Sequence, residues 1–193
     1  MKRIILASQS PRRRKIMELL RIEFEYCPAD INEIFLPQEK PRDAVRRIAQ
    51  SKAEQVRELV GSGLIISADT VVVCNGEMLG KPGDEQDAYN KLSILKGTKH
   101  EVITAVCVLD AESGFFEVQD ETTWVYFRDI TDDEIKAYIS TGEPMDKAGA
   151  YAIQGTGSVF IERIEGCYFN VVGLPIKNLY SMLRRQGVKL LEV

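Results

Sequence analysis

The segment Ser8-Gln9-Ser10-Pro11-Arg12-Arg13 places basic side chains where a helix is predicted to begin. Ser10 is a good N-cap and proline suits the first position of a helix, so we expect the helix to start at Pro11. Backbone N–H groups at such a start attract anions. Arginines there oppose the helix dipole unless an anion is present. The pattern is equally consistent with an anion-binding turn and with a basic turn exposed to water.

Lys52 is the second candidate, because it lies on the apolar side of a predicted helix that runs from Pro41 to about Val60. It follows Val45 by about two helical turns and therefore shares the apolar face of that residue. An ammonium group on such a face needs a charged partner or a ligand. The alternative is a lysine whose methylene stem packs against the core while its head reaches water.

Asp69 and Lys81 are the third and fourth candidates. In Ser67-Ala68-Asp69-Thr70 the carboxylate emerges from an apolar strand, an environment suited to a general base or a metal ligand. In Leu79-Gly80-Lys81-Pro82 the ammonium is held on a short turn, which is also typical of an ordinary surface loop. Either signal is weak alone, because aspartate often ends a strand.

The fifth segment, residues 144–155, is rich in small residues and ends with Gln154. Its small side chains allow close approach to the backbone, and the Gln154 amide can both donate and accept a hydrogen bond. The pair Gly155 and Gly157 lacks the third glycine of a dinucleotide-binding fingerprint, and no phosphate-binding P-loop pattern is present.

Composition restricts the remaining possibilities. The 193 residues include 25 Lys and Arg against 29 Asp and Glu, a net charge of −4, which argues against a broad nucleic-acid-binding face. A single histidine, His100, excludes a multi-histidine metal site and is predicted to be structural. The four cysteines are far apart, without zinc-site spacing, and indicate reduced, mostly buried thiols. We expect no secretory leader, no membrane span and a cytoplasmic location.

Strand-like and helix-like segments alternate along the chain, which favours an α/β or α+β fold. Predicted strands cover residues 4–7, 24–27, 64–68 continuing through 71–74, 78–79, 102–109, 115–127, 159–164 and 168–172. Predicted helices cover residues 11–20, 41–60, 84–95, 131–142 and 175–185. A hairpin turn is predicted at Asn75-Gly76, and residues 28–40 are predicted to form a loop.

Taken in order, these segments resemble the Maf family, also described as septum formation inhibitors or nucleotide pyrophosphatases. The resemblance spans residues 4–183. It rests on Leu6-Ala7-Ser8-Gln9-Ser10-Pro11-Arg12-Arg13, Ala49-Gln50-Ser51-Lys52-Ala53, Ala68-Asp69-Thr70, Leu79-Gly80-Lys81-Pro82, residues 144–155 and Gly173-Leu174-Pro175. Each motif is modest alone, but the ordered set is specific.

The resemblance implies a single domain over residues 1–193. Its fold would be α/β, with a long twisted mixed sheet and flanking helices in two lobes around a central cleft, similar to inosine triphosphate pyrophosphatases. It further implies a homodimeric enzyme that splits nucleoside triphosphates into a monophosphate and pyrophosphate with a divalent cation, Mg²⁺ or Mn²⁺. The motif positions match the branch similar to dTTP/UTP pyrophosphatases, with CTP and modified uridine triphosphates as further candidate substrates.

The resemblance also assigns roles to individual residues. Catalytic roles fall on Asp69 as general base, with Lys52 and Lys81; metal ligation falls on Glu33 and Asp69; substrate binding falls on Ser8, Arg12, Arg13, Thr70 and Gln154. Arg12, Thr70 and Gln154 are the positions linked to choice of base. Glu33 lies in a predicted loop with little surrounding motif.

Two other classes of function stay open at this stage. A nucleotide-binding regulator of cell division, acting through protein contacts, would share the same cationic residues. A nucleic-acid-binding module is suggested by the basic run Arg12-Arg13-Arg14-Lys15, but the acidic balance and the lack of aromatic stacking motifs argue against it.

Overall fold

The computed structural model describes residues 2–191, and its elements alternate along the chain much as the apolar pattern predicts. They are β1 (Ile4–Leu6), α1 (Pro11–Leu19), β2 (Glu25–Tyr26), α2 (Pro41–Val60), β3 (Leu64–Cys74), β4 (Glu77–Leu79), α3 (Glu85–Leu95), β5 (Lys99–Asp110), β6 (Phe116–Phe127), α4 (Asp132–Ile139), the 3-10 turns η1 (Glu143–Asp146), η2 (Ala148–Ala150) and η3 (Thr156–Phe160), β7 (Ile161–Glu165), α5 (Tyr168–Val172) and α6 (Ile176–Arg185).

The strands form a mixed sheet, seven-stranded within residues 2–191, in the order β2-β1-β3-β5-β6-β7, with β4 paired to β3. β1 is parallel to both β2 and β3, whereas the β3–β4 and β6–β7 pairs are antiparallel. The predicted hairpin at Asn75-Gly76 is present, and both residues have positive φ, as the tight two-residue turn requires. The predicted α/β class is therefore confirmed.

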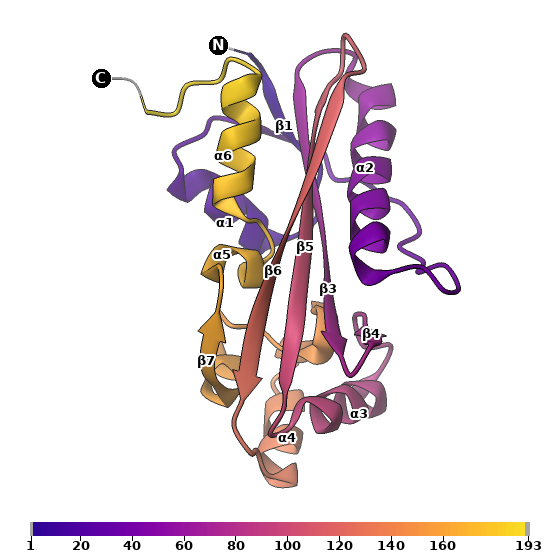
Figure 1. Ribbon diagram of the computed structural model, residues 1–193, viewed down its shortest axis with the longest axis vertical. Coiled ribbons are helices and arrows are strands. Elements are labelled where there is room, and N and C mark those ends of the chain that lie inside the picture. Colours follow the sequence, from indigo (N-terminus) through magenta and orange to yellow (C-terminus); the bar gives the residue numbers. More distant parts are fainter. Residues whose placement is uncertain (1, 192–193) are drawn as a thin grey trace. The chain divides into compact units, whose positions relative to one another are not determined.

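Two compact units divide the described chain. Unit 1 comprises residues 2–69, 104–121 and 173–191, and unit 2 comprises residues 70–103 and 122–172. In unit 1, α2 lies on one side of the strands, and α1 and α6 lie on the other (Figure 1). The apolar residues of β1 and of the first half of β3 are fully buried there, as expected for parallel strands covered on both faces.

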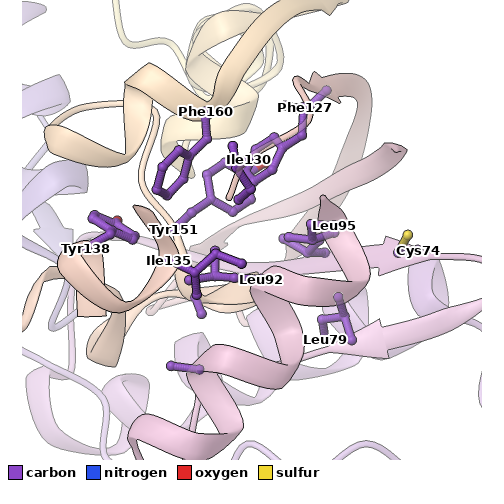
Figure 2. Packing of buried hydrophobic residues seen from close by; sticks show 14 of the residues in the cluster. Cys74, Leu79, Leu92, Leu95, Phe127, Ile130, Ile135, Tyr138, Tyr151 and Phe160 are labelled. Atoms are coloured by element: carbon purple, nitrogen blue, oxygen red, sulfur yellow. The ribbon is translucent and has the colours of Figure 1, made fainter. Parts of the chain in front are cut away.

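Unit 2 has its own hydrophobic core, which gathers side chains from α3, α4, β6 and the 3-10 turns (Figure 2). Leu92 and Leu95 of α3, Phe127 of β6, Ile135 of α4 and Phe160 of η3 are all buried in it. Tyr151 stacks edge-on against Phe127, with ring centroids 4.7 Å apart. This core holds together the short irregular segments that follow α4.

The helix boundaries follow capping chemistry. Ser10 caps α1 and Thr131 forms a capping box with Glu134 at the start of α4, both as predicted. α2 begins with proline at Pro41 and ends at Gly61, which takes the left-handed conformation. Among the described residues, no helix is long and apolar enough to cross a membrane.

The prediction of a strand at residues 168–172 is wrong, because this segment forms the short helix α5. A five-residue apolar run does not distinguish a strand from a buried helical turn by periodicity. Within this helix the buried amide of Asn170 donates to the carbonyl of Val102 and to the hydroxyl of Thr123, both at 2.9 Å. The strand predicted at 159–164 begins only at Ile161, after the turn η3.

All four cysteines are free thiols, Cys74 and Cys107 being buried and Cys27 and Cys167 half-buried. His100 is fully buried in unit 2, where its Nε2 lies 2.7 Å from the hydroxyl of Tyr151. Burial without a counter-charge lowers the pKa of His100 to about 3. The imidazole is therefore neutral at physiological pH and structural, as predicted.

His100 should make the stability of unit 2 depend on pH. As the pH falls below 6.5, His100 becomes protonated in the unfolded chain, whereas in the folded chain it stays neutral until about pH 3. The free energy of unfolding therefore falls as the pH is lowered across this interval. Between pH 7 and pH 5 the loss should be about 2 kcal/mol. Urea unfolding followed by fluorescence of Trp124, the single tryptophan, measures it. In His100→Gln this part of the pH dependence should vanish, and an unchanged pH dependence would contradict the assignment.

Candidate active site

The turn between β1 and α1 is organised by three side chains. Ser8 is buried, and its Oγ accepts hydrogen bonds from the backbone N–H of Ser10 and from Nη1 of Arg13, both at 3.2 Å. Nε of Arg13 donates to the carbonyl of Gly173 at 2.7 Å. Arg13 is thus held by the strand end before its own helix and by the segment before α6. A guanidinium fixed in this way is placed to bind an anion at the helix N-terminus.

The ammonium group of Lys52 contacts two carboxylates in unit 1. Its Nζ lies 2.7 Å from Oδ1 of Asp69 and 2.8 Å from Oε1 of Glu33. The Lys52 and Asp69 side chains are each only 7% exposed, whereas that of Glu33 is 36% exposed. Of the two possibilities that the sequence left open for Lys52, the structure shows the buried lysine with charged partners and not the head group that reaches water. Residues from β3, α2 and the loop after β2 meet at one ammonium group.

Asp69 is held between opposing influences. Burial raises the pKa of Asp69 above its ordinary value, while Lys52 by charge and hydrogen bond, and Arg13 by charge, lower it in part. Burial is the largest influence, so the net direction is upward. The neighbouring Asp69 and Glu33 charges in turn favour the charged form of Arg13, whose pKa burial lowers. A buried carboxylate with an elevated pKa facing two cations has the properties of a general base.

The position of α2 along β3 determines that Lys52 reaches Asp69. Ser67 and Asp69 point to the same face of β3, since strand side chains alternate. The hydroxyl of Ser67, fully buried, donates to the carbonyl of Ala49 on α2 at 2.5 Å. Ala49 and Lys52 lie one turn apart on that helix. The Ser67 contact therefore fixes the helix beside the strand at the level where Lys52 reaches Asp69.

The loop that carries Glu33 has no regular structure but is tied to α2 at two points. The amide of Gln55 accepts from the N–H of Asp30 at 2.7 Å and donates to its carbonyl at 2.6 Å. Arg47 donates to the carbonyl of Ile34 at 3.0 Å and forms a bidentate pair with Glu39, at 2.7 Å for each contact. Sequence reasoning missed Gln55 and Arg47; the one available signal is their place on the helix that carries Lys52.

The other predicted site residues lie elsewhere in the chain. Arg12 is half-buried in the first turn of α1. Thr70, Lys81 and Gln154 belong to unit 2: Thr70 is half-buried in β3, while Lys81 and Gln154 are exposed in irregular segments. Within unit 2 the Gly149 N–H donates to the carbonyl of Gly80 at 3.2 Å. The turn carrying Lys81 is therefore joined to the segment that leads to Gln154.

The carboxylates of Glu33 and Asp69 can be compared with the ligands that a hard divalent cation requires. Glu33 and Asp69 supply carboxylate oxygens on either side of one ammonium group. Within residues 2–191 no three His, Cys, Asp or Glu side chains gather in a way that could cage a metal. Magnesium commonly takes only one or two protein carboxylates, the rest of its shell coming from water and substrate phosphates. The two carboxylates fit that mode of binding.

The Lys52–Asp69 contact predicts a marked effect on stability. Lys52→Met leaves a buried carboxylate without its ammonium partner and should cost roughly 3–5 kcal/mol in unfolding free energy at neutral pH. Lys52→Met combined with Asp69→Asn removes both charges and should recover much of that loss. Urea unfolding followed by far-ultraviolet circular dichroism measures both. A double variant no more stable than Lys52→Met alone would contradict the account.

Known proteins resemble this chain over nearly its whole length. The family model described as "Maf-like protein" matches residues 3–186. A protein of Syntrophomonas wolfei named dTTP/UTP pyrophosphatase is 55% identical over 187 residues, covering 97% of this chain and 99% of the relative. One of the same name from Ruminiclostridium cellulolyticum is 45% identical over 193 residues, with complete coverage of both.

A solved structure shares the fold at a much lower level of sequence similarity. The Staphylococcus aureus Ham1 protein is 12% identical, with a TM-score of 0.55, covering 96% of this chain and all of the other. Such a likeness supports the α/β architecture alone. Membership of a family rests instead on the family model and on the two relatives, which cover nearly all of the sequence. The chain belongs to the Maf family.

Proposed function

We propose that this protein hydrolyses dTTP and UTP to the nucleoside monophosphate and pyrophosphate. The observation that carries the proposal is the buried contact between Lys52 and Asp69, whose carboxylate is also subject to the charge of Arg13. The names of the relatives, dTTP/UTP pyrophosphatase, support the choice of substrate. CTP and modified uridine triphosphates are further candidates within the same chemistry.

Charge is the first requirement of the substrate. A triphosphate carries several negative charges, and a protein of net charge −4 needs local cations to receive it. In unit 1 those cations are Arg12, Arg13 and Lys52, and the N-terminus of α1 adds its partial positive charge. Arg13 is held in place by its hydrogen bond to the hydroxyl of Ser8. The proposal assigns Lys81 of unit 2 to the same triphosphate. Arginine supplies paired contacts and lysine a point charge.

The proposal includes a divalent cation, Mg²⁺ or Mn²⁺, held by Glu33 and Asp69. When bound, such an ion neutralises phosphate charge and orients the phosphate oxygens. Lys52 would then keep the two carboxylates close together, since its ammonium contacts both. Because Glu33 lies on a loop tied to α2 by Gln55 and Arg47, that loop sets where the second carboxylate stands.

Asp69 would act as the base. Its carboxylate takes a proton from a water molecule as the water oxygen forms a bond to the α-phosphorus, and the bond from that phosphorus to the bridging oxygen breaks. Pyrophosphate leaves with the bonding electron pair. The raised pKa of Asp69 makes its carboxylate a better proton acceptor than an ordinary aspartate. Lys52 and Arg13 stabilise the charge that develops on the phosphate oxygens.

Choice of base would depend on Gln154, with Arg12 and Thr70. Uracil and thymine present an N–H between two carbonyl groups, which a glutamine amide matches by accepting from the N–H and donating to a carbonyl. Cytosine lacks that N–H, so the glutamine acceptor would lose its partner. Gln154 is exposed in unit 2 and so is accessible to such a ligand.

We also propose the domain organisation, location and oligomeric state of the enzyme. We take residues 1–193 as one functional domain with two lobes, acting on free nucleotides rather than on nucleic acid or membranes. The four free thiols are consistent with a cytoplasmic location. We infer a homodimer from the family resemblance, and light scattering on the purified protein would test it, a monomeric mass counting against it.

The function is tested by a panel of nucleoside triphosphates with Mg²⁺ or Mn²⁺, measuring the pyrophosphate released. We expect dTTP and UTP to be hydrolysed most efficiently. Asp69→Asn should lower turnover roughly 10²–10⁴-fold, because the amide cannot accept the proton, while circular dichroism shows a folded protein. Wild-type silence on the whole panel would favour a nucleotide-binding regulator instead. A near-wild-type rate for Asp69→Asn would remove this residue as the base.

Gln154→Ala tests the choice of base separately. The variant should lose discrimination between UTP and CTP more than it loses turnover, because the alanine leaves the phosphate-binding cations untouched. The expected change in the ratio of kcat/KM values is on the order of tenfold. The measurement is kcat and KM for both nucleotides on the same preparation. An equal loss on every substrate would count against a role in base recognition.

A further inference from the structure

One carboxylate in unit 2 accepts three hydrogen bonds, two of them from backbone N–H groups that closely follow Gln154 in the chain. Oε2 of Glu143 accepts from the backbone N–H of Thr156 at 2.9 Å. Its Oε1 accepts from the N–H of Gly157 at 3.1 Å and from the hydroxyl of Tyr138 at 2.9 Å. Glu143 lies at the start of η1, so its side chain joins that turn to the start of η3 and to α4.

Tyr138 extends the same network to the other side of Gln154. Its hydroxyl accepts from the backbone N–H of Ala152 at 3.3 Å while it donates to Glu143. Tyr138 is buried in the core of unit 2, where it stacks edge-on against Phe160; Figure 2 shows its place in that core. Backbone groups before and after Gln154 are therefore both attached to one rigid pair of side chains.

The two glycines after Gln154 are explained by this network. A Cβ on Gly155 would lie 2.6 Å from Oε1 of Glu143, and one on Gly157 would lie 2.6 Å from the hydroxyl of Tyr138. Gly155 also has φ +139°, which side-chain-bearing residues rarely adopt. The Gly155-x-Gly157 pattern, too weak for a dinucleotide site, thus marks where the backbone passes close to Glu143 and Tyr138.

Tyr138 stays protonated and Glu143 stays charged, which are the states in which the hydroxyl donates and the carboxylate accepts. Burial and the contact with Glu143 raise the pKa of Tyr138, which stays a hydroxyl donor. For Glu143, burial favours the neutral form, but the N–H groups of Gly157 and Thr156 and the Tyr138 hydroxyl outweigh it and lower the pKa. A charged acceptor facing three donors makes strong hydrogen bonds, which restrict the segment to one conformation.

We propose that Glu143 and Tyr138 are positioning residues for pyrimidine selection: they hold residues 152–157 so that the Gln154 amide meets the edge of the base. This inference rests on the proposed function. A glutamine on a flexible loop would lose conformational entropy on binding a base, which would weaken binding. A glutamine whose loop is already held in one conformation would lose less. Removing the support should therefore weaken recognition of the base more than attack on the phosphate.

The test compares Tyr138→Phe and Glu143→Gln with two matched controls in the same unit. The hydroxyl of Tyr126 donates to Oε2 of Glu165 at 2.9 Å, the same kind of contact on strands away from Gln154, so the controls are Tyr126→Phe and Glu165→Gln. For each protein kcat and KM are measured for UTP and CTP. The ratio of the two kcat/KM values does not depend on the fraction of folded enzyme.

We expect Tyr138→Phe and Glu143→Gln to lower the UTP-over-CTP ratio on the order of tenfold, mainly through a higher KM for UTP. The controls should leave the ratio unchanged. Added to Gln154→Ala, neither substitution should lower the ratio further, since the residue they position is already gone. A purely structural role would reduce both activities equally and leave the ratio as in the wild type.

Three results would overturn the inference while leaving the proposed function intact. They are an unchanged ratio in both variants, an equal shift in the matched controls, and a further drop in the Gln154→Ala background. Failure of the proposed function would be seen in the wild type and not in the variants, because the wild type would then release no pyrophosphate from UTP or dTTP. That result would remove both proposals together.

Discussion

The ammonium group of Lys52 stands almost out of water between the carboxylates of Asp69 and Glu33, and the architecture of unit 1 is arranged around it. Removing two charges from water is costly, and their attraction offsets that cost only when the geometry is close and fixed. A strand buried on both faces, a long helix packed beside it and a loop fastened to that helix meet this requirement. The result is an ammonium group held in contact with two carboxylates that come from different parts of the chain.

The same contact supports the role in proton transfer that we propose for Asp69. In water its carboxylate would be too weak a base, and in an apolar core it would stay protonated. Burial raises its pKa, and Lys52 and Arg13 limit that rise. Arg13 is itself held by the hydroxyl of Ser8 and the carbonyl of Gly173, so the balance depends on parts of the chain far apart in sequence.

In unit 2, side chains bind the backbone N–H groups of irregular segments. Its irregular segments between α4 and β7 cannot satisfy their backbone groups in a ladder, and side chains do so instead. Glu143 and Tyr138 serve backbone N–H groups on both sides of Gln154, and Gly149 pairs with Gly80 at the turn that carries Lys81. The predicted site residues of this unit, Lys81 and Gln154, lie in irregular segments, and the unit has the hydrophobic core shown in Figure 2.

Local pattern was sufficient for much of this protein. Apolar periodicity, capping residues and turn chemistry predicted the main helices, the hairpin and the strand that presents Asp69, because each depends on neighbours within one or two turns. The apolar face of α2 was also enough to single out Lys52. What needed the tertiary structure were contacts between distant segments: that Glu33 reaches Lys52, that Gln55 and Arg47 fasten its loop, and that Glu143 organises the residues around Gln154. The contacts of Asn170 in α5 are of the same kind, since its partners, Val102 and Thr123, lie on β5 and β6. A side chain's partners across the fold leave no periodic trace in sequence, and only the folded chain decides them.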